Sequence, residues 1–313
     1  MINMPPKTSK IVFQSIHSII MLILIFFVIG RYGQSYYLFD LLNHFRPFFI
    51  LVFLVLWCWV SLKKYSHRVW LYLLLAILFN SHMMQRFPSK NSKLPVDLHI
   101  LHFNLLVDNP NHSAVLDTIR QHQPQLISFQ ETTPRWAKIL KKELPEYRFI
   151  CHVLDTPFGI CAATTLTLEE EDIFFVQNPQ VPSISLRTTI NSNSISVVFI
   201  HPKPPFTQSF FIQRNRYLEK LTMRLQQEHN LIVIGDFNTT QWSPIYQQMS
   251  SALQLKNTLS GIQNTWPSFL IPIFQLDHIL ISERFHTIEA EVLSDIGSDH
   301  YPIRAKIRIP PPQ

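Results

Sequence analysis

The stretch LIVIGDFNTTQW, residues 231–242, ends an apolar run with side chains that can do chemistry. Four branched apolar residues lead into Gly235, and then Asp236 and Asn238 follow two positions apart. An aspartate placed at the end of a buried strand can orient or deprotonate a water molecule, and an asparagine beside it can hold an anion. The same two residue types also favour a simple turn after a strand, so this pair alone does not establish a site.

The same arrangement, a polar residue at the end of an apolar run, recurs along the chain. The further examples are Asn104, Glu131, His201, Asp277 with His278, and Asp299 with His300. If these strand ends meet at one edge of a sheet, their carboxylates repel one another unless a cation or a histidine neutralises them. Magnesium prefers oxygen ligands and keeps several waters, so the sequence predicts a Mg²⁺ site, with Mn²⁺ as the alternative.

Other histidines are expected outside this site. His278 follows Asp277 directly on a strand, so its side chain is predicted to point to the opposite face. Surface or packing positions are predicted for His99, His102, His112 and His122.

Five short motifs carry a resemblance to a known family. They are FN at 103–104, FQE at 129–131, GDFN at 235–238, LDHIL at 276–280 and SDH at 298–300. In this order and at these intervals they resemble the endonuclease/exonuclease/phosphatase superfamily, over about residues 96–309. The details HPKPP, DFNTTQWSP, TWP and GSDHYP resemble a bacterial, membrane-anchored branch of it.

This resemblance implies an α/β fold, a four-layer αββα sandwich of the DNase I-like type, preceded by N-terminal transmembrane helices. It also implies a divalent metal ion and hydrolysis of a phosphoester. By position, Glu131 resembles the metal-binding carboxylate, and Asn104 and Asp299 resemble its neighbours around the ion. Some abasic-site endonucleases carry an acid two residues after the first Asn. Leu106 stands there in this chain, which makes that DNA-repair identity less favoured.

The resemblance also assigns the catalytic positions. Asp236 resembles the residue that orients or deprotonates the attacking water, and Asn238 resembles the one that holds the phosphate or that water. His300, held by Asp277, resembles the histidine on the scissile phosphate, and His201 sits where relatives contact the phosphate. A carboxylate behind a histidine keeps it in the tautomer that presents its other nitrogen to the substrate.

The composition separates the chain into two parts. Hydrophobic residues make up 47% of the 313, and the chain carries a net charge of +6. The first 94 residues contain ten Lys or Arg and one acid, Asp40, so the remainder carries a net charge of −3. The basic excess therefore does not mark the rest of the chain as a nucleic-acid-binding domain.

The front part reads as a membrane region, residues 1–87. A charge-free run at 11–29 is long enough for one bilayer crossing, and further apolar runs at 47–62 and 69–84 follow it. The third is apolar only over 69–79 and is either a buried helix or a span, so two or three transmembrane helices are predicted. Lys7 and Lys10 precede the first run, as in a signal peptide, but no small-residue cleavage site follows, which favours an uncleaved anchor. Residues 88–95 read as a linker, and residues 96–309 as the catalytic domain.

Basic residues indicate the orientation. Lys7 and Lys10 and the basic residues at 63–68 fall on one side of three crossings, which places the N-terminus in the cytoplasm. The catalytic domain is then predicted outside the bacterial inner membrane. Arg86, Lys90 and Lys93 would follow it outward, against the rule.

The cysteines leave two readings open. Cys58 lies inside an apolar run, and Cys151 and Cys161 are ten residues apart and can pair in an oxidising compartment. The favoured prediction is that both of these thiols are unpaired.

The sequence predicts a membrane-anchored phosphodiesterase with the lipid bilayer and a phosphoester substrate as its partners, and no obligate protein partner. One candidate substrate is nucleic acid. The alternative is a phospholipid or another small phosphorylated molecule, as in the sphingomyelinases. A catalytically inactive scaffold is the third alternative. Segments 151–160 and 261–274 carry no readable specificity, Trp266 is expected in the core, and Arg214 and Arg216 are expected on a solvated helix face.

Overall fold

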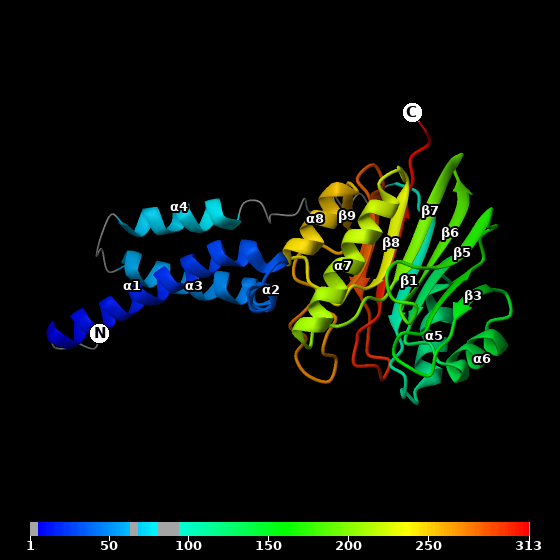
Figure 1. Cartoon of the computed structure of the whole chain (residues 1–313), viewed down its shortest axis with the longest axis horizontal. Helices are drawn as coiled ribbons and strands as arrows, with labels where there is room; N and C mark the ends of the chain where they lie inside the picture. The colour runs from blue at the N-terminus through cyan, green and yellow to red at the C-terminus, as the bar shows by residue number, and fades with distance from the viewer. Residues whose placement is uncertain (1–5, 63–67, 81–93, 313) are drawn as a thin grey trace. The chain divides into compact units, whose positions relative to one another are not determined.

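A computed structural model describes residues 6–62, 68–80 and 94–312 of the chain (Figure 1). The chain divides into two compact units. The first comprises Met1–Gln85 and Trp242–Gln247, and the second comprises Arg86–Gln241 and Gln248–Gln313. We call the second the sandwich unit. The predicted linker lies outside the described residues except for its last two positions.

The N-terminal part of the first unit is helical. Its elements are α1 (Pro6–Ile29), the 3-10 helix η1 (Gly30–Gln34), α2 (Tyr37–His44), α3 (Arg46–Leu62) and α4 (Arg68–Asn80). Among the described residues, Ile11–Gln34 is long and apolar enough to cross a membrane, and α2 with α3, bent by 65°, form a second candidate. The predicted third run continues to residue 84, outside the described residues, so a third span stays a prediction.

Two six-stranded sheets form the sandwich unit. The first has the order β11-β12-β1-β2-β4-β3, and the second has the order β5-β6-β7-β8-β10-β9. The first sheet consists of β1 (Leu98–Asn104), β2 (Leu126–Gln130), β3 (Arg148–His152), β4 (Ile160–Thr164), β11 (His286–Val292) and β12 (Ile303–Arg308). The second consists of β5 (Glu170–Phe175), β6 (Pro182–Ile190), β7 (Asn193–Ile200), β8 (Leu231–Asp236), β9 (Leu255–Asn257) and β10 (Asp277–Ser282). Both sheets are mixed, because β1 with β2 and β7 with β8 are parallel.

Helices cover the outer faces of the sheets. Three of them begin at a side chain that accepts a hydrogen bond from the first turn: Asn111 caps α5 (His112–His122), Thr133 caps α6 (Pro134–Glu143) and Thr207 caps α7 (Gln208–Leu225). The helices α5 and α6 bury Val115, Leu116, Ile119, Trp136 and Leu140 against Leu101, Phe103, Ile127 and Phe129 of the first sheet. On the second sheet, the Tyr217 hydroxyl of α7 lies 2.6 Å from Ser183 Oγ of β6. Helix α8 spans Pro244–Ala252. The predicted αββα sandwich is therefore confirmed.

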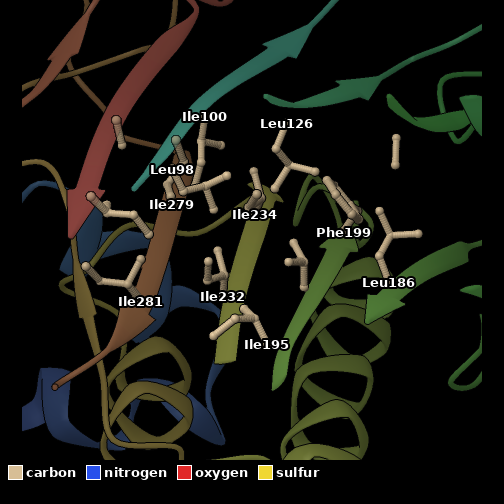
Figure 2. Close-up of a cluster of buried hydrophobic side chains, with 14 of the residues drawn as sticks. Leu98, Ile100, Leu126, Leu186, Ile195, Phe199, Ile232, Ile234, Ile279 and Ile281 are labelled. Atoms are coloured by element: carbon tan, nitrogen blue, oxygen red, sulfur yellow. The ribbon is translucent and has the colours of Figure 1, made fainter. Parts of the chain in front are cut away.

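The apolar layer between the sheets is built by alternate residues of each strand. Leu98, Ile100 and Leu126 of the first sheet pack with Ile232, Ile234, Ile279 and Ile281 of the second (Figure 2). Full burial of one such side chain contributes about 1.5–3 kcal/mol. The same period of two carries polar residues onto this inner face toward one edge, where His102 and Asn104 continue β1 and Asp236 ends β8.

Cys151 and Cys161 form a disulfide, so the prediction of unpaired thiols is wrong. They stand directly opposite each other on the antiparallel strands β3 and β4, with their Cα atoms 4.1 Å apart. This close approach is typical of a pair without mutual backbone hydrogen bonds. Their spacing in the sequence does not reveal that they are cross-strand partners.

Candidate active site

Strand register brings the predicted site residues to one edge of the two sheets. In the first sheet Asn104 pairs with Gln130, the residue before Glu131. In the second sheet Asp236 pairs directly with Asp277. His201 follows Ile200, which pairs with Gly235. Asp299 and His300 lie in the segment between β11 and β12. Strand pairing thus brings five of these seven positions to one edge, and the segment before β12 adds Asp299 and His300.

Asn104 joins two of the carboxylates. Its side-chain Nδ2 donates to Glu131 Oε1 at 3.2 Å and to Asp236 Oδ2 at 3.3 Å. The other oxygen of Glu131 accepts from the backbone N–H of Val107 at 3.1 Å. Burial raises the pKa of Glu131, and the charge of His201 only partly opposes this effect. Glu131 is therefore a carboxylate that gains from a nearby cation.

Asp236 lies between two histidines. Its Oδ2 is 3.5 Å from His201 Nε2 and 3.7 Å from His300 Nε2. Its other oxygen accepts from the backbone N–H of Asn238 at 2.8 Å, which is the turn expected after a strand. The carboxylate of Asp236 thus stabilises the turn with one oxygen and faces the two histidines of the site with the other. Asn238 Nδ2 donates to the carbonyl of Pro202 at 2.9 Å and so holds the segment after His201.

Asp277 is shared by two histidines. Its Oδ2 lies 2.8 Å from His300 Nδ1, and its Oδ1 lies 2.8 Å from His102 Nε2. Burial raises the pKa of Asp277, but the charge of His300 and the hydrogen bonds from both imidazoles outweigh burial and lower that pKa overall. An ionised carboxylate only accepts hydrogen bonds, so each histidine presents an N–H to it.

The two histidines beside Asp236 favour the protonated form. Burial lowers the pKa of His300, but the charges of Asp277 and Asp236 outweigh burial and raise it to about 10. Burial likewise lowers the pKa of His201, and its hydrogen bond to Asp236 and the charge of that residue raise it overall. The two imidazoles therefore offer charged N–H donors at neutral pH and partly neutralise the carboxylates around them.

Asp299 is held by Trp266, whose Nε1 donates to Asp299 Oδ2 at 3.3 Å. The other oxygen, Oδ1, is buried and makes no hydrogen bond among the described residues. The charge of Asp299 acts on both Glu131 and His300, which places it in the same cluster. A buried carboxylate oxygen without a donor is an available ligand for a cation.

Three turns that carry site residues adopt left-handed backbone. The φ angles of Leu106, Glu131 and Asn238 are 58°, 58° and 49°. Such conformations cost non-glycine residues about 1–2 kcal/mol each. These conformations turn the chain sharply at the strand ends and direct the Glu131 and Asn238 side chains back to the site. The surrounding fold must stabilise these three residues in the unfavourable conformation.

Two sets of side chains can hold a divalent ion. Asp236, Asp277 and His300 offer ligand atoms within 4.8 Å of one another. Both oxygens of Asp277 are already occupied by histidines, however, which weakens this set. The predicted ligands Asn104, Glu131 and Asp299 supply hard oxygen atoms, the kind that Mg²⁺ prefers, and one of them, Asp299 Oδ1, makes no hydrogen bond among the described residues.

His102 is buried, in keeping with the predicted packing position, but its contact with Asp277 in the site was not predicted. The alternation of β1 was the available signal, since His102 is two residues before Asn104 and so shares its face. Arg214 is also buried, contrary to its prediction, and its Nη1 donates to the carbonyl of Asn238 at 3.0 Å. His278 lies on the opposite face as predicted, 3.0 Å from the carbonyl of Thr239.

The sequence profile of the Endonuclease/Exonuclease/phosphatase family matches residues 101–300, most of the sandwich unit and nearly two thirds of the chain. The chain belongs to this family. The resemblance drawn from the five motifs is thereby confirmed. The matched residues run from β1 to His300 and therefore include the whole cluster at the sheet edge.

Solved structures of this family share the fold. A family protein from Leptotrichia buccalis is 19% identical, with a TM-score of 0.58 over 68% of this chain and 100% of its own. TDP2 from D. rerio, complexed with single strand DNA product, is 14% identical, with a TM-score of 0.58 over 68% and 99% of the two chains. A mannosyl-6-phosphatase from Bacteroides thetaiotaomicron is 18% identical, with a TM-score of 0.55 over 68% and 100%. No curated protein matches the chain in sequence.

Proposed function

We propose that this protein is a membrane-anchored, metal-dependent phosphoesterase that hydrolyses a phosphodiester by attack of water. The observation that carries the proposal is the position of Asp236, which lies between His201 and His300 and is joined to Glu131 through Asn104. This arrangement combines a carboxylate for the water with two cationic donors for the phosphate.

In this proposal Glu131, Asn104 and Asp299 hold Mg²⁺, with Mn²⁺ as the alternative. A bound divalent ion would neutralise phosphate charge and stabilise the leaving oxygen. The amide of Asn104 separates Glu131 from Asp236, so these two carboxylates can serve the ion and the water separately.

Asp236 orients the attacking water and accepts its proton. His300, kept protonated and oriented by Asp277, donates a hydrogen bond to the phosphate from Nε2. His201 supplies a second cationic donor, and Asn238 fixes the segment that carries it. Positioned acid–base groups of this kind contribute roughly 10²–10⁴-fold in rate.

The anchor and its orientation belong to the same proposal. Ile11–Gln34 is apolar enough to cross a bilayer, although a signal sequence near an N-terminus has the same character. The disulfide between Cys151 and Cys161 supports an oxidising compartment, in keeping with a sandwich unit outside the bacterial inner membrane. The basic residues around the predicted spans support that side as well.

The relatives do not select the substrate. TDP2 was solved with single strand DNA product, and another relative is a mannosyl-6-phosphatase. The net charge of −3 behind residue 94 gives no general attraction to nucleic acid. An inactive scaffold is disfavoured, because every acid and histidine of the cluster is present and hydrogen-bonded in one place.

The test is a substrate panel offered to the purified full chain in detergent with Mg²⁺ or Mn²⁺: bis-p-nitrophenyl phosphate, plasmid DNA and sphingomyelin. We expect metal-dependent turnover of the diester, and its loss in His300→Ala with the circular dichroism spectrum unchanged. Absence of turnover with every substrate and both metals would favour the scaffold. Full activity of His300→Ala would contradict the assigned site.

A further inference from the structure

The connection between β9 and β10 folds into a small hairpin, Thr265–Phe274. The backbone N–H of Trp266 donates to the carbonyl of Phe274 at 3.0 Å, and the N–H of Phe274 donates back to the carbonyl of Trp266 at 3.0 Å. The rings of these two residues stack with centroids 6.1 Å apart and planes 7° apart. The base of this hairpin is therefore a defined structure, and its tip is held in a fixed place.

The tip of the hairpin is apolar and exposed. Phe269, Leu270, Ile271 and Ile273 expose 70%, 67%, 85% and 51% of their surfaces. No charged residue occurs between positions 261 and 275. Contiguous apolar surface of this kind is unfavourable in water and marks an interaction site.

The hairpin is attached to the candidate active site. The N–H of Ser268 donates to the carbonyl of Asp299 at 2.8 Å, and the Tyr301 hydroxyl donates to the carbonyl of Ser268 at 3.1 Å. The Trp266 indole holds the Asp299 carboxylate, as described above. The chain then runs from Phe274 into Asp277 at the start of β10. Whatever the tip binds is thus brought to the rim of the site.

The size and chemistry of the tip favour a lipid surface over a protein partner. A stable protein interface uses about 20–30 residues on each side, with a polar rim, whereas this tip offers four apolar side chains and no charge. Aromatic and branched side chains on a short loop suit the boundary between head groups and acyl chains. Phe206 is also exposed, on the segment that leaves the same sheet edge after His201.

We propose that the tip of the 265–274 hairpin inserts into the surface of a lipid bilayer, and that the substrate is a phosphodiester carried by a lipid head group. The substrate assignment rests on the proposed function. In the reaction, the water oxygen bonds to phosphorus, the bond from phosphorus to the leaving alcohol oxygen breaks, and that oxygen takes a proton. The insertion places the head groups of the bilayer at the entrance of the site.

Insertion is tested on the full chain, reconstituted in phosphatidylcholine vesicles. With Cys58 replaced by serine, a polarity-sensitive fluorophore is attached at Ile271→Cys. The control position is Lys142→Cys on the exposed face of α6. We expect a blue shift and quenching by nitroxide-labelled lipids at position 271 and neither effect at position 142. A water-exposed fluorophore at 271 would overturn the insertion, and a shielded fluorophore that lipid nitroxides do not quench would indicate a protein partner and overturn it also.

The substrate class is tested with the double variant Leu270→Ser/Ile271→Ser, which leaves the catalytic cluster intact. We expect turnover of sphingomyelin or phosphatidylcholine in vesicles to fall by at least about tenfold, because two apolar anchors are lost. Hydrolysis of bis-p-nitrophenyl phosphate should stay within about twofold of the parent chain. Equal loss on both substrates, or no loss on either, would overturn the inference. A parent chain inactive on both the soluble diester and the lipids would instead overturn the proposed function, and the quenching result would still decide whether the tip enters the bilayer.

Discussion

His102 Nε2 lies 2.8 Å from Asp277 Oδ1, a contact that joins the two sheets of the sandwich inside the candidate active site. His102 belongs to β1 of the first sheet, and Asp277 begins β10 of the second. Ser128 Oγ lies 3.1 Å from His102 Nδ1 and fixes the ring from the other side. His102 thus positions Asp277, which in turn orients His300.

Replacement of His102 tests this positioning role. His102→Phe removes the donor to Asp277 and leaves one carboxylate oxygen buried without a partner, so His300 loses its fixed orientation. We expect kcat to fall by roughly 10- to 100-fold with KM little changed. His102→Asn, whose amide keeps a donor, should recover part of kcat. The exposed His229→Gln is the matched control, and equal kcat values for His102→Phe and the control would refute the role.

The pH dependence of kcat depends on Asp277. The raised pKa of His300, about 10, keeps its imidazole charged at pH values well above the ordinary pKa of a histidine. The ion pair therefore contributes stability that is fully present below about pH 6.5, the unfolded value, and is lost as the pH rises through about 10. In Asp277→Asn this charge is gone, so the pKa of His300 falls and its charged form is lost at lower pH.

The measurement is the pH–rate profile of both proteins at saturating metal ion. The parent chain should keep its activity through pH 8 to 9, near the raised pKa of His300, while the variant loses activity about one or more units earlier. Identical alkaline limbs would show that Asp277 does not control the charge of His300.

Removal of the metal should abolish turnover, and Glu131 should set the metal affinity. We expect EDTA to eliminate activity and Mg²⁺ to restore it. Glu131→Gln removes a charged oxygen ligand and should raise the Mg²⁺ concentration needed for half-maximal activity by roughly 10- to 100-fold. The matched control is the exposed Glu146→Gln. An unchanged Mg²⁺ titration in Glu131→Gln would remove this residue from the metal site.

The disulfide can be counted by thiol labelling. The chain contains three cysteines, and Cys58 is the free one among the described residues. Under denaturing conditions a maleimide should label one thiol per chain before reduction and three after it. Cys151→Ser with Cys161→Ser should lower the free energy of unfolding by about 3 kcal/mol, because a short loop is no longer closed in the unfolded chain. Three labelled thiols without reduction would contradict the bond.

Gly235 stands where the strands β7 and β8 approach closely. A Cβ atom at this position would lie 2.0 Å from the carbonyl oxygen of Ile200, so β7 would have to move. Gly235→Ala should lower the free energy of unfolding by about 1–3 kcal/mol and reduce kcat, because His201 follows Ile200 and contacts Asp236. Gly261→Ala is a useful contrast. Its Cβ meets nothing within 4 Å, although its φ of +76° is unfavourable for alanine, and it should cost about 1 kcal/mol without loss of kcat. Denaturant unfolding and kinetics measure both effects.

The sequence predicted the site best where a buried strand ends abruptly in a polar residue. Asn104 and Asp236 were found in this way, because an apolar run of several residues specifies both the strand and its end. Asp277 was expected at the end of an apolar run as well, but it begins β10, and it reaches the same edge because β10 runs antiparallel to β8. Edge strands lack that signal. β5 exposes most of its residues, and β11 alternates polar and apolar positions, so their pairing with β6 and β12 came only from the tertiary structure.

The residues that were missed or misassigned are those whose role depends on a distant partner. His102 meets Asp277 across 175 positions of sequence, and Cys151 meets Cys161 only because β3 and β4 are in register. Arg214 reaches Asn238 from α7, although helical periodicity alone is compatible with a solvated face. A single histidine, cysteine or arginine in a sequence does not show which residue it contacts when that contact depends on the tertiary structure.

Because the two sheets contribute different parts of the cluster, the cluster is complete only when both sheets have folded and packed together. The first sheet alone carries Asn104 and Glu131, together with His300 in the segment that leads into β12. The second sheet alone carries Asp236 and Asp277. Hydrolytic activity should therefore appear together with the final cooperative step of assembly. Turnover of a chromogenic diester would then serve as a real-time reporter of that step.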